Sequence, residues 1–334
     1  MKIFVCEFIT GGGLYRESLP PSLAREGALM RDALLRDLGE LQDAEVTITY
    51  DTRLPAPTHL RQAIPVSMQD DVWQIWSQCI ADADAVWPIA PETGGVLLRL
   101  TELVNSSHKI LLGCSAEGVK LTSSKLATYL ALQAAEVSTV PTYKPESWPK
   151  NQITHWVSKP DDGVGCEGSA YFATAQALEN WIAQGRETSH IIQPFKTGTP
   201  ASISMLCKQG QAWLLSCNQQ KITLDSGAFI YNGSVLNGMA EYWSAFDILA
   251  QQVASAIPSL SGYVGVDILV DGKQISVLEV NPRLTTSYVG LHEAIGCNPA
   301  RLVLDLLYNH DFQPAAFKMP KEISRNVAEV TLND

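Results

Sequence analysis

Short apolar runs alternate with segments of helical spacing along the first 115 residues of the chain. Four apolar runs have the length and composition of buried strands: KIFVCEF, EVTITY, DAVWPIA and KILLGC. Between them, apolar residues recur every three or four positions, which predicts helices over 22–41, 70–81 and 92–104. Because strands that alternate with helices are typical of a parallel sheet, we expect a small parallel α/β domain here, with ligands near the strand ends.

After residue 120 the pattern becomes rich in strands. Helical spacing returns in four segments: 123–135, 175–184, 245–257 and 298–307. Apolar or alternating runs predict strands over 155–160, 169–174, 190–195, 201–208, 211–222 and 234–243. Two further runs, GYVGVDILV and KQISVLEVN, are joined by Asp271-Gly272, a dipeptide that favours a hairpin turn. This mixture predicts an α+β fold, and the tail after Asp311 shows no strong period.

Carboxylates interrupt both runs of that predicted hairpin. Asp267 lies within GYVGVDILV, and Glu279 lies within SVLEVNP, two residues before Asn281. Because side chains alternate along a strand, Glu279 and Asn281 share a face, and pairing of the two strands would bring Asp267 close to Glu279. Neighbouring buried carboxylates repel unless a cation lies between them, and oxygen ligands of this kind suit Mg²⁺. The sequence therefore predicts a magnesium site, with solvent-facing polar positions on a half-exposed sheet as the alternative.

A glycine-rich loop follows another predicted strand. Lys159 ends the strand and DDGVGCEG comes next, so that Gly163, Gly165 and Gly168 leave backbone N–H groups free to point at a phosphate. The spacing is neither that of a P-loop nor that of a dinucleotide-binding fingerprint. A lysine beside such a loop indicates a phosphate site, although an ordinary hairpin turn with an exposed lysine explains it too. Lys125 begins a predicted helix, where a positive charge is unfavourable, which is weak evidence for a bound anion rather than a solvated lysine.

Composition excludes several other classes of protein. The chain of 334 residues has a net charge of −11, which argues against a general nucleic-acid or acidic-membrane partner, since both need a basic face. Its seven cysteines are scattered without metal-ligand spacing, which favours a reduced, cytoplasmic protein. No apolar run reaches the roughly 18 residues of a membrane-spanning helix, so we expect no membrane span.

The order of these features resembles that of a known family. The strand IIQPFKTG stops at a proline and leaves backbone groups that could contact an adenine ring, or it is a plain strand end. The succession of Lys125, Lys159 with its loop, QPF, Asp267 and EVNPR resembles the ATP-grasp superfamily of carboxylate–amine ligases. The resemblance covers 117–307, and the preceding α/β segment is similar to the domain that usually comes before it.

This resemblance implies an α/β N-terminal domain followed by an α+β ATP-grasp fold, whose two subdomains clasp ATP. It implies three segments: a pre-ATP-grasp domain over 1–117, a central subdomain with the glycine lid over 118–190, and a C-terminal subdomain with the magnesium site over 191–334. The activity it implies is formation of an amide, in which ATP first converts the carboxylate into an acyl phosphate.

The resemblance also implies roles for single residues. Phosphate contacts would come from Lys125 and Lys159, beneath a lid that contains Gly163, Gly165 and Gly168. Adenine contacts would come from Gln193, Pro194 and Phe195. Mg²⁺, with Mn²⁺ as an alternative ion, would be held by Asp267, Glu279 and Asn281, and the catalytic residues would be Arg283 and Lys159. The chain departs from the family pattern at Gln193 and Pro200, where acidic residues are usual, which leaves the ribose contacts open.

Three short motifs are similar to those of a narrower group. EFITGGG, IAPETGG and NPRLTTSY resemble the tyramine–glutamate ligase group of methanofuran biosynthesis. That resemblance implies glutamate and an amine such as tyramine or tyrosine as substrates, and a homodimer as the assembly. The alternatives are an ATP-grasp ligase for another amino acid or peptide pair and a non-catalytic nucleotide-binding protein. Glu92, which follows a strand, could bind an ammonium group or simply favour the start of a helix.

Overall fold

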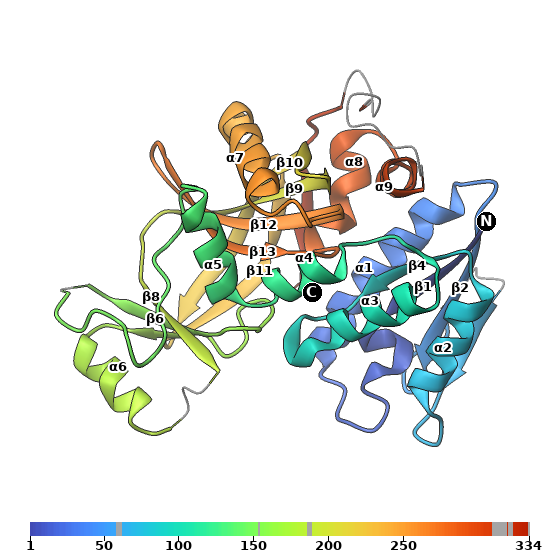
Figure 1. Ribbon diagram of the computed structural model, residues 1–334, viewed down its shortest axis with the longest axis horizontal. Helices are drawn as coiled ribbons and strands as arrows, with labels where there is room; N and C mark the ends of the chain where they lie inside the picture. Colours follow the sequence, from blue (N-terminus) through green and yellow to red (C-terminus); the bar gives the residue numbers. More distant parts are fainter. Residues whose placement is uncertain (58–61, 153, 186–188, 309–318, 320–322, 333–334) are drawn as a thin grey trace.

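The computed structural model describes residues 1–57, 62–152, 154–185, 189–308, 319 and 323–332. Two sheets organise these residues, a parallel sheet near the N-terminus and a larger, mostly antiparallel sheet built from the rest of the chain (Figure 1). Both the α/β start and the α+β remainder that the sequence predicts are therefore confirmed. No helix in these ranges is long and apolar enough to cross a membrane.

The N-terminal sheet has helices on both faces. Its strand order is β3-β2-β1-β4-β5, with the bounds β1 (Lys2–Glu7), β2 (Glu45–Asp51), β3 (Gln62–Val66), β4 (Ala85–Ile89) and β5 (Ile110–Leu111). Side chains of β1 alternate between the two faces, because Ile3 and Val5 pack toward α1 (Pro21–Gly39) and Phe4 packs toward α2 (Val72–Asp82). Helices α3 (Val96–Ser106) and α4 (Ala116–Thr122) complete this half.

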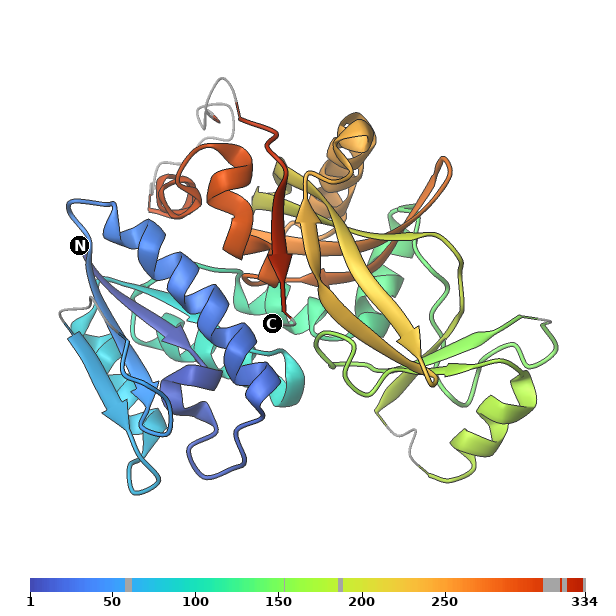
Figure 2. The ribbon, with the colours of Figure 1, turned by 180° about the vertical axis from the view of Figure 1, so that it is seen from behind.

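The second sheet runs through the rest of the molecule in the order β13-β12-β9-β10-β11-β7-β6-β8, with β14 beside β11 (Figure 2). Its strands are β6 (Trp156–Pro160), β7 (Ala170–Phe172), β8 (His190–Pro194), β9 (Thr199–Lys208), β10 (Gln211–Asp225), β11 (Ala228–Leu236), β12 (Gly262–Asp271), β13 (Gln274–Asn281) and β14 (Ala328–Thr331). The helices are α5 (Lys125–Ala134), α6 (Ala175–Ile182), α7 (Trp243–Ala256), α8 (Leu291–Ile295) and α9 (Pro299–Leu307). The domain boundaries at 117 and 190 stay predictions. The second sheet continues across the one at 190, because β8 spans it and pairs with β6.

Two predicted elements end or begin elsewhere. The strand expected over 234–243 ends at Leu236, because Asn237 has a left-handed φ of 55° and its side chain accepts a hydrogen bond from the N–H of Cys217. The helix expected over 92–104 begins at Val96, since the two glycines before it have φ values of 64° and 70°. Strands β3 and β14 had no counterpart in the sequence pattern, because both are short and lie at sheet edges.

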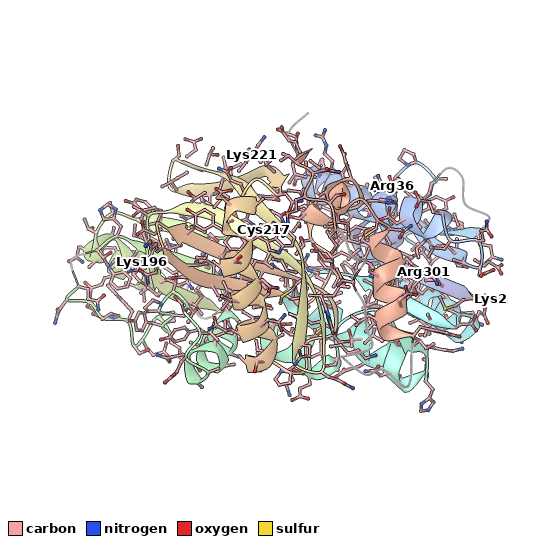
Figure 3. The ribbon with its side chains drawn as sticks, turned by 90° about the horizontal axis from the view of Figure 1, so that it is seen from above. Lys2, Arg36, Lys196, Cys217, Lys221 and Arg301 are labelled. Carbon is pink, nitrogen blue, oxygen red and sulfur yellow. The ribbon has the colours of Figure 1, made fainter. Side chains whose placement is uncertain are left out.

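Helix α1 joins the two halves. It packs against α9, and Figure 3 labels Arg36 on α1 and Arg301 on α9. The fully buried Asp37 of α1 accepts a hydrogen bond of 2.8 Å from Nδ1 of His292, and its carbonyl oxygen accepts one of 2.7 Å from Asn298. Because these contacts link the N-terminal domain to α8 and the start of α9, they fix the orientation of α1 toward the centre of the molecule.

Candidate active site

Asp267 and Glu279 lie directly opposite each other on the paired strands β12 and β13. A β-bulge at Leu278 creates this alignment, since the register from the turn up to Ile268 would otherwise set Leu278 opposite Asp267. Asn281 lies two residues further and donates a hydrogen bond of 3.4 Å to Oδ2 of Asp267. The three predicted metal ligands therefore share one face of the sheet. Gln220 of β10, which the sequence reasoning missed, donates a 2.9 Å bond to Oδ1 of Asp267.

Electrostatics at this site favour a cation. Burial and the charge of Glu279 raise the pKa of Asp267 to about 7, against the lowering effect of hydrogen bonds from Asn281 and Gln220. A divalent cation between the two carboxylates would remove this repulsion, and two carboxylates with an amide oxygen are ligands that Mg²⁺ accepts. In the part of the chain that the structure describes, no cluster of three or more His, Cys, Asp or Glu side chains offers another metal site. The donor set therefore fits Mg²⁺ with the remaining ligands coming from elsewhere.

Lys125 faces the same carboxylates from the first turn of α5. Its Nζ lies 3.0 Å from Oε1 of Glu279 and donates a 2.5 Å hydrogen bond to the carbonyl oxygen of Gly163. Ser124 caps the helix by accepting a hydrogen bond from Ala127, which fixes where Lys125 emerges. With only 5% of its side chain exposed, Lys125 is held between the glycine loop and the metal-ligand strand.

Lys159 is the second cation near these carboxylates. It lies in β6 and is partly buried. Burial lowers the pKa of its ammonium, the charges of Glu279 and Asp267 raise it, and the charge of Lys125 lowers it. These charge effects indicate that the ammonium of Lys159 is close enough to Lys125, Glu279 and Asp267 to be influenced by their charges. The structure therefore brings together the phosphate and metal residues that the sequence predicts.

The glycine loop between β6 and β7 is held against the N-terminal domain. Gly165 and Gly168 have left-handed φ values of 60° and 70°. Asp162, at the start of the loop, accepts a 2.9 Å bond from Oγ1 of Thr93 at its carbonyl oxygen and a 3.0 Å bond from the N–H of Gly94 at its carboxylate. We call these two hydrogen bonds of Asp162 the latch. The sequence analysis did not predict it, because the residues that it joins are 68 and 69 positions apart in the chain.

The predicted adenine segment lies at the end of β8. The side chain of Gln193 is buried and donates a 2.9 Å hydrogen bond to Thr142, so it points into the protein. The N–H of Phe195 donates to the carbonyl oxygen of His155, and its ring packs edge-on against Tyr171 with centroids 5.2 Å apart. If adenine binds at this strand end, it would therefore contact backbone groups and the surface of this aromatic cluster. That role stays a prediction for Gln193, Pro194 and Phe195.

Arg283 follows the metal-ligand strand and turns toward the N-terminal domain. Its Nε lies 3.0 Å from Oε2 of Glu92, and its Nη1 donates to the carbonyl oxygen of Leu284. Burial alone would lower the pKa of Arg283, but the charge and hydrogen bond of Glu92 raise it on balance. In the structure, Glu92 therefore pairs with Arg283, whereas the sequence analysis offered it as a ligand for an ammonium group.

A cleft of about 1130 Å³ opens beside Arg283. Four parts of the chain line it: the loop after β1 with the start of α1, the segment after β4, the glycine loop, and β11. Gly165, Cys166 and Arg283 belong to its wall, so the cleft meets the predicted phosphate site at the glycine loop. A charged site of this kind, next to a roomy cleft, can neutralise a polyphosphate while a second molecule lies alongside it.

Comparison with known proteins agrees with this geometry. The family description "ATP-grasp domain" matches residues 122–287, and "pre ATP-grasp 3 domain" matches residues 44–119. Tyramine–L-glutamate ligase of Methanocaldococcus jannaschii is 26% identical over 305 residues, which cover 90% of this chain and 88% of the relative. The protein of the same name from Methanocaldococcus fervens is 29% identical over 208 residues, 62% of this chain and 61% of the relative. An ATP-grasp superfamily protein from Archaeoglobus fulgidus superposes with a TM-score of 0.69 at 24% identity, covering 91% of this chain and 88% of that one.

Proposed function

Because the chain belongs to the ATP-grasp superfamily of ligases, we propose that it joins a carboxylate to an amine through an acyl phosphate, with glutamate as the acid and tyramine or tyrosine as the amine. The observation that carries this proposal is the convergence of two lysines on two opposed carboxylates, Lys125 and Lys159 on Asp267 and Glu279. That arrangement suits the triphosphate of ATP and its accompanying Mg²⁺ or Mn²⁺.

The reaction explains why these residue types are needed. A carboxylate is a poor acyl donor, because oxide would have to leave. Its oxygen attacks the γ-phosphorus of ATP, the bond from that phosphorus to ADP breaks, and an acyl phosphate forms. The amine nitrogen then bonds to the acyl carbon, the carbon–oxygen bond to phosphate breaks, and inorganic phosphate leaves while the nitrogen loses its extra protons. An anion attacks an anion in the first step, so fixed positive charge in a water-poor site lowers its barrier.

Each residue of the site has a part in this scheme. Lys125 and Lys159 bind the phosphates, and Arg283 stabilises the phosphate during its transfer. Asp267, Glu279 and Asn281 would hold the metal ion, which neutralises phosphate charge when bound. The glycine loop, latched through Asp162, would cover the acyl phosphate and keep out water that would hydrolyse it.

The substrates are proposed from the relatives and from where the shared motifs lie. IAPETGG contributes Pro91 and Thr93 to the cleft wall, and NPRLTTSY contributes Arg283. EFITGGG contributes Glu7, Phe8 and Ile9, so all three motifs that resemble the tyramine–glutamate ligase group border the space where an acid and an amine would meet. This assignment would place the reaction in methanofuran biosynthesis. A homodimer and the segment boundaries at 117 and 190 are part of the same proposal.

A substrate panel tests the proposal. The purified chain would be incubated with ATP, Mg²⁺ and pairs of amino acids and amines, and ADP, phosphate and the product mass would be measured. We expect glutamate with tyramine or tyrosine to give stoichiometric ADP, phosphate and amide. An amide from a different pair would reject these substrates and retain the ligase. ATP binding without turnover for any pair would favour the non-catalytic alternative.

A further inference from the structure

The cleft is bordered by several carboxylates, and they differ in what they contact. Glu7 is fully engaged, since its oxygens accept hydrogen bonds of 3.1 Å and 2.6 Å from the N–H groups of Ile9 and Thr10 and another from the Thr10 hydroxyl. Glu92 is not part of the cleft wall; its Oε2 pairs with Arg283, and its Oε1 is buried without a hydrogen-bond partner among the described residues. Glu17 and Glu167 are exposed to solvent. Among the carboxylates that line the cleft, Glu7 is therefore already satisfied, and Glu17 and Glu167 are well hydrated.

Glu26 is the remaining carboxylate of the cleft wall. It lies on the first half of α1, is partly buried, and forms no hydrogen bond or ion pair with any residue that the structure describes. Burial raises the pKa of Glu26, which means that its charged form has lost hydration, and only the charge of Arg283 acts in the opposite direction. A cationic ligand beside it would restore the lost stabilisation.

The position of Glu26 is fixed by the packing of α1. The next residue, Gly27, lies so close to β1 that a Cβ there would come within 2.8 Å of Oε1 of Glu7. This contact and the links from α1 to α8 and α9 hold the helix in place above the cleft. The carboxylate of Glu26 therefore faces the cleft from a rigid element rather than from a loop.

The surroundings of Glu26 suit an amine with an apolar body. Apolar side chains from the loop after β1 and from α1 line the same wall, among them Ile9, Leu14, Leu23 and Met30. Arg283 and Glu26 both line this cleft, and the charge of each affects the pKa of the other. A molecule with its apolar part on this wall and its ammonium at Glu26 would have its nitrogen on the side of Arg283.

We propose that Glu26 binds the ammonium group of the amine substrate and positions its nitrogen toward the acyl phosphate beside Arg283. This inference rests on the proposed ligase function and assigns the amine subsite to the start of α1. It makes Glu26 a specificity-determining residue for an amine with an apolar body, which binds as the ammonium and gives up one proton before its nitrogen attacks the acyl carbon. The acid and ATP would bind elsewhere in the cleft and in the phosphate site, independently of Glu26.

Substrate-specific kinetics of Glu26→Gln and Glu26→Asp test this inference. Amide formation would be measured with ATP, glutamate and tyramine varied in turn. The same proteins would be assayed with hydroxylamine, a small nucleophile that is neutral at the assay pH and traps the acyl phosphate as a hydroxamate. Glu17→Gln is the matched control, because Glu17 lies on the rim of the same cleft but is exposed.

We expect Glu26→Gln to raise KM for tyramine roughly 10- to 100-fold, the usual effect of losing a hydrogen bond to a charged group. KM for glutamate and ATP and the rate of hydroxamate formation should stay at wild-type values, which also shows that the variant is folded. Glu26→Asp should recover part of the tyramine affinity, and Glu17→Gln should behave as wild type.

Two results would overturn the inference. An unchanged KM for tyramine in Glu26→Gln, with hydroxamate formation intact, would show that the ammonium binds elsewhere. A rise in KM for glutamate instead would assign Glu26 to the acid substrate. Failure of the proposed function is distinguishable from both, because the wild-type chain itself would then form no hydroxamate from any acid.

Discussion

Lys125 and Glu279 form an ion pair of 3.0 Å that connects the start of α5 to β13, the strand that carries two of the predicted metal ligands. Both side chains are largely buried, at 5% and 15% exposure. A phosphate oxygen would compete with Glu279 for the ammonium of Lys125, and a metal ion would compete with Lys125 for the carboxylate. When ATP and its metal bind, the contact between Lys125 and Glu279 would be replaced by two others, one from Lys125 to a phosphate oxygen and one from Glu279 to the metal. This exchange would couple nucleotide binding to metal binding.

Replacing Lys125 by methionine tests the phosphate side of this pair. We expect the Kd for ATP to rise roughly 10- to 100-fold, because a charge-assisted hydrogen bond is lost. The variant should also unfold at a lower temperature, since Glu279 is left buried without its partner. Calorimetric titration with ATP and a thermal melt would measure both. Lys120→Met is the control, because Lys120 is exposed on the preceding helix, and equal ATP affinity in the two variants would contradict the assignment.

Asp267→Asn tests the metal side. The substitution keeps the size of the side chain but removes one of the two opposed charges, so we expect the Mg²⁺ concentration for half-maximal activity to rise at least tenfold. Thermal stability should be kept or increased, because the repulsion from Glu279 disappears. A Mg²⁺ titration at saturating ATP would measure the shift. Asp271→Asn, at the exposed hairpin turn, should leave the titration unchanged, and an identical response of both variants would argue against a metal at Asp267.

Asp162→Ala should loosen the glycine loop from the N-terminal domain, because it removes the carboxylate that accepts the hydrogen bond from Gly94. We expect more ATP hydrolysed per amide formed, since water gains access to the acyl phosphate. The ratio of phosphate to amide, measured in one reaction mixture, reports this uncoupling. Asp225→Ala at the exposed β10–β11 turn is the control. A ratio that stays at one in Asp162→Ala would show that the latch does not exclude water.

Cys166 offers a reporter of the same loop. Burial raises the pKa of its thiol to about 11, with Lys159 acting against this and nearby carboxylates adding to it. Because the thiolate is the reactive form, alkylation by iodoacetamide should accelerate about tenfold per pH unit up to that pKa. ATP should slow the labelling by ordering the loop. Mass spectrometry of a Cys297→Ser background, which removes the other half-buried thiol, would follow it, and labelling that ignores ATP would contradict a lid role.

Much of the fold could be predicted because its signals are local. The apolar run of β1 and the helical spacing of α1 predicted the strand and helix alternation of the first domain, and the ATP-grasp resemblance rested on residues in a fixed order. The fold class and the family were therefore confirmed. Contacts such as Asp162 with Gly94, Gln220 with Asp267 and Arg283 with Glu92 join distant segments, and no local pattern indicates them.

The hairpin of β12 and β13 illustrates which features the sequence determined and which only the tertiary structure decided. The sequence by itself determined the two strands, the Asp271-Gly272 turn and the presence of carboxylates in apolar runs. It did not determine that Asp267 faces Glu279, because the register from the turn sets Leu278 opposite Asp267 until the bulge intervenes. Next to that bulge, the backbone of Val277 forms hydrogen bonds with the backbone of Ser138 and Val140, which belong to the segment after α5. A one-residue shift moves a side chain to the other face of a sheet, so the bulge, which only the tertiary structure shows, decides that the two carboxylates lie opposite each other.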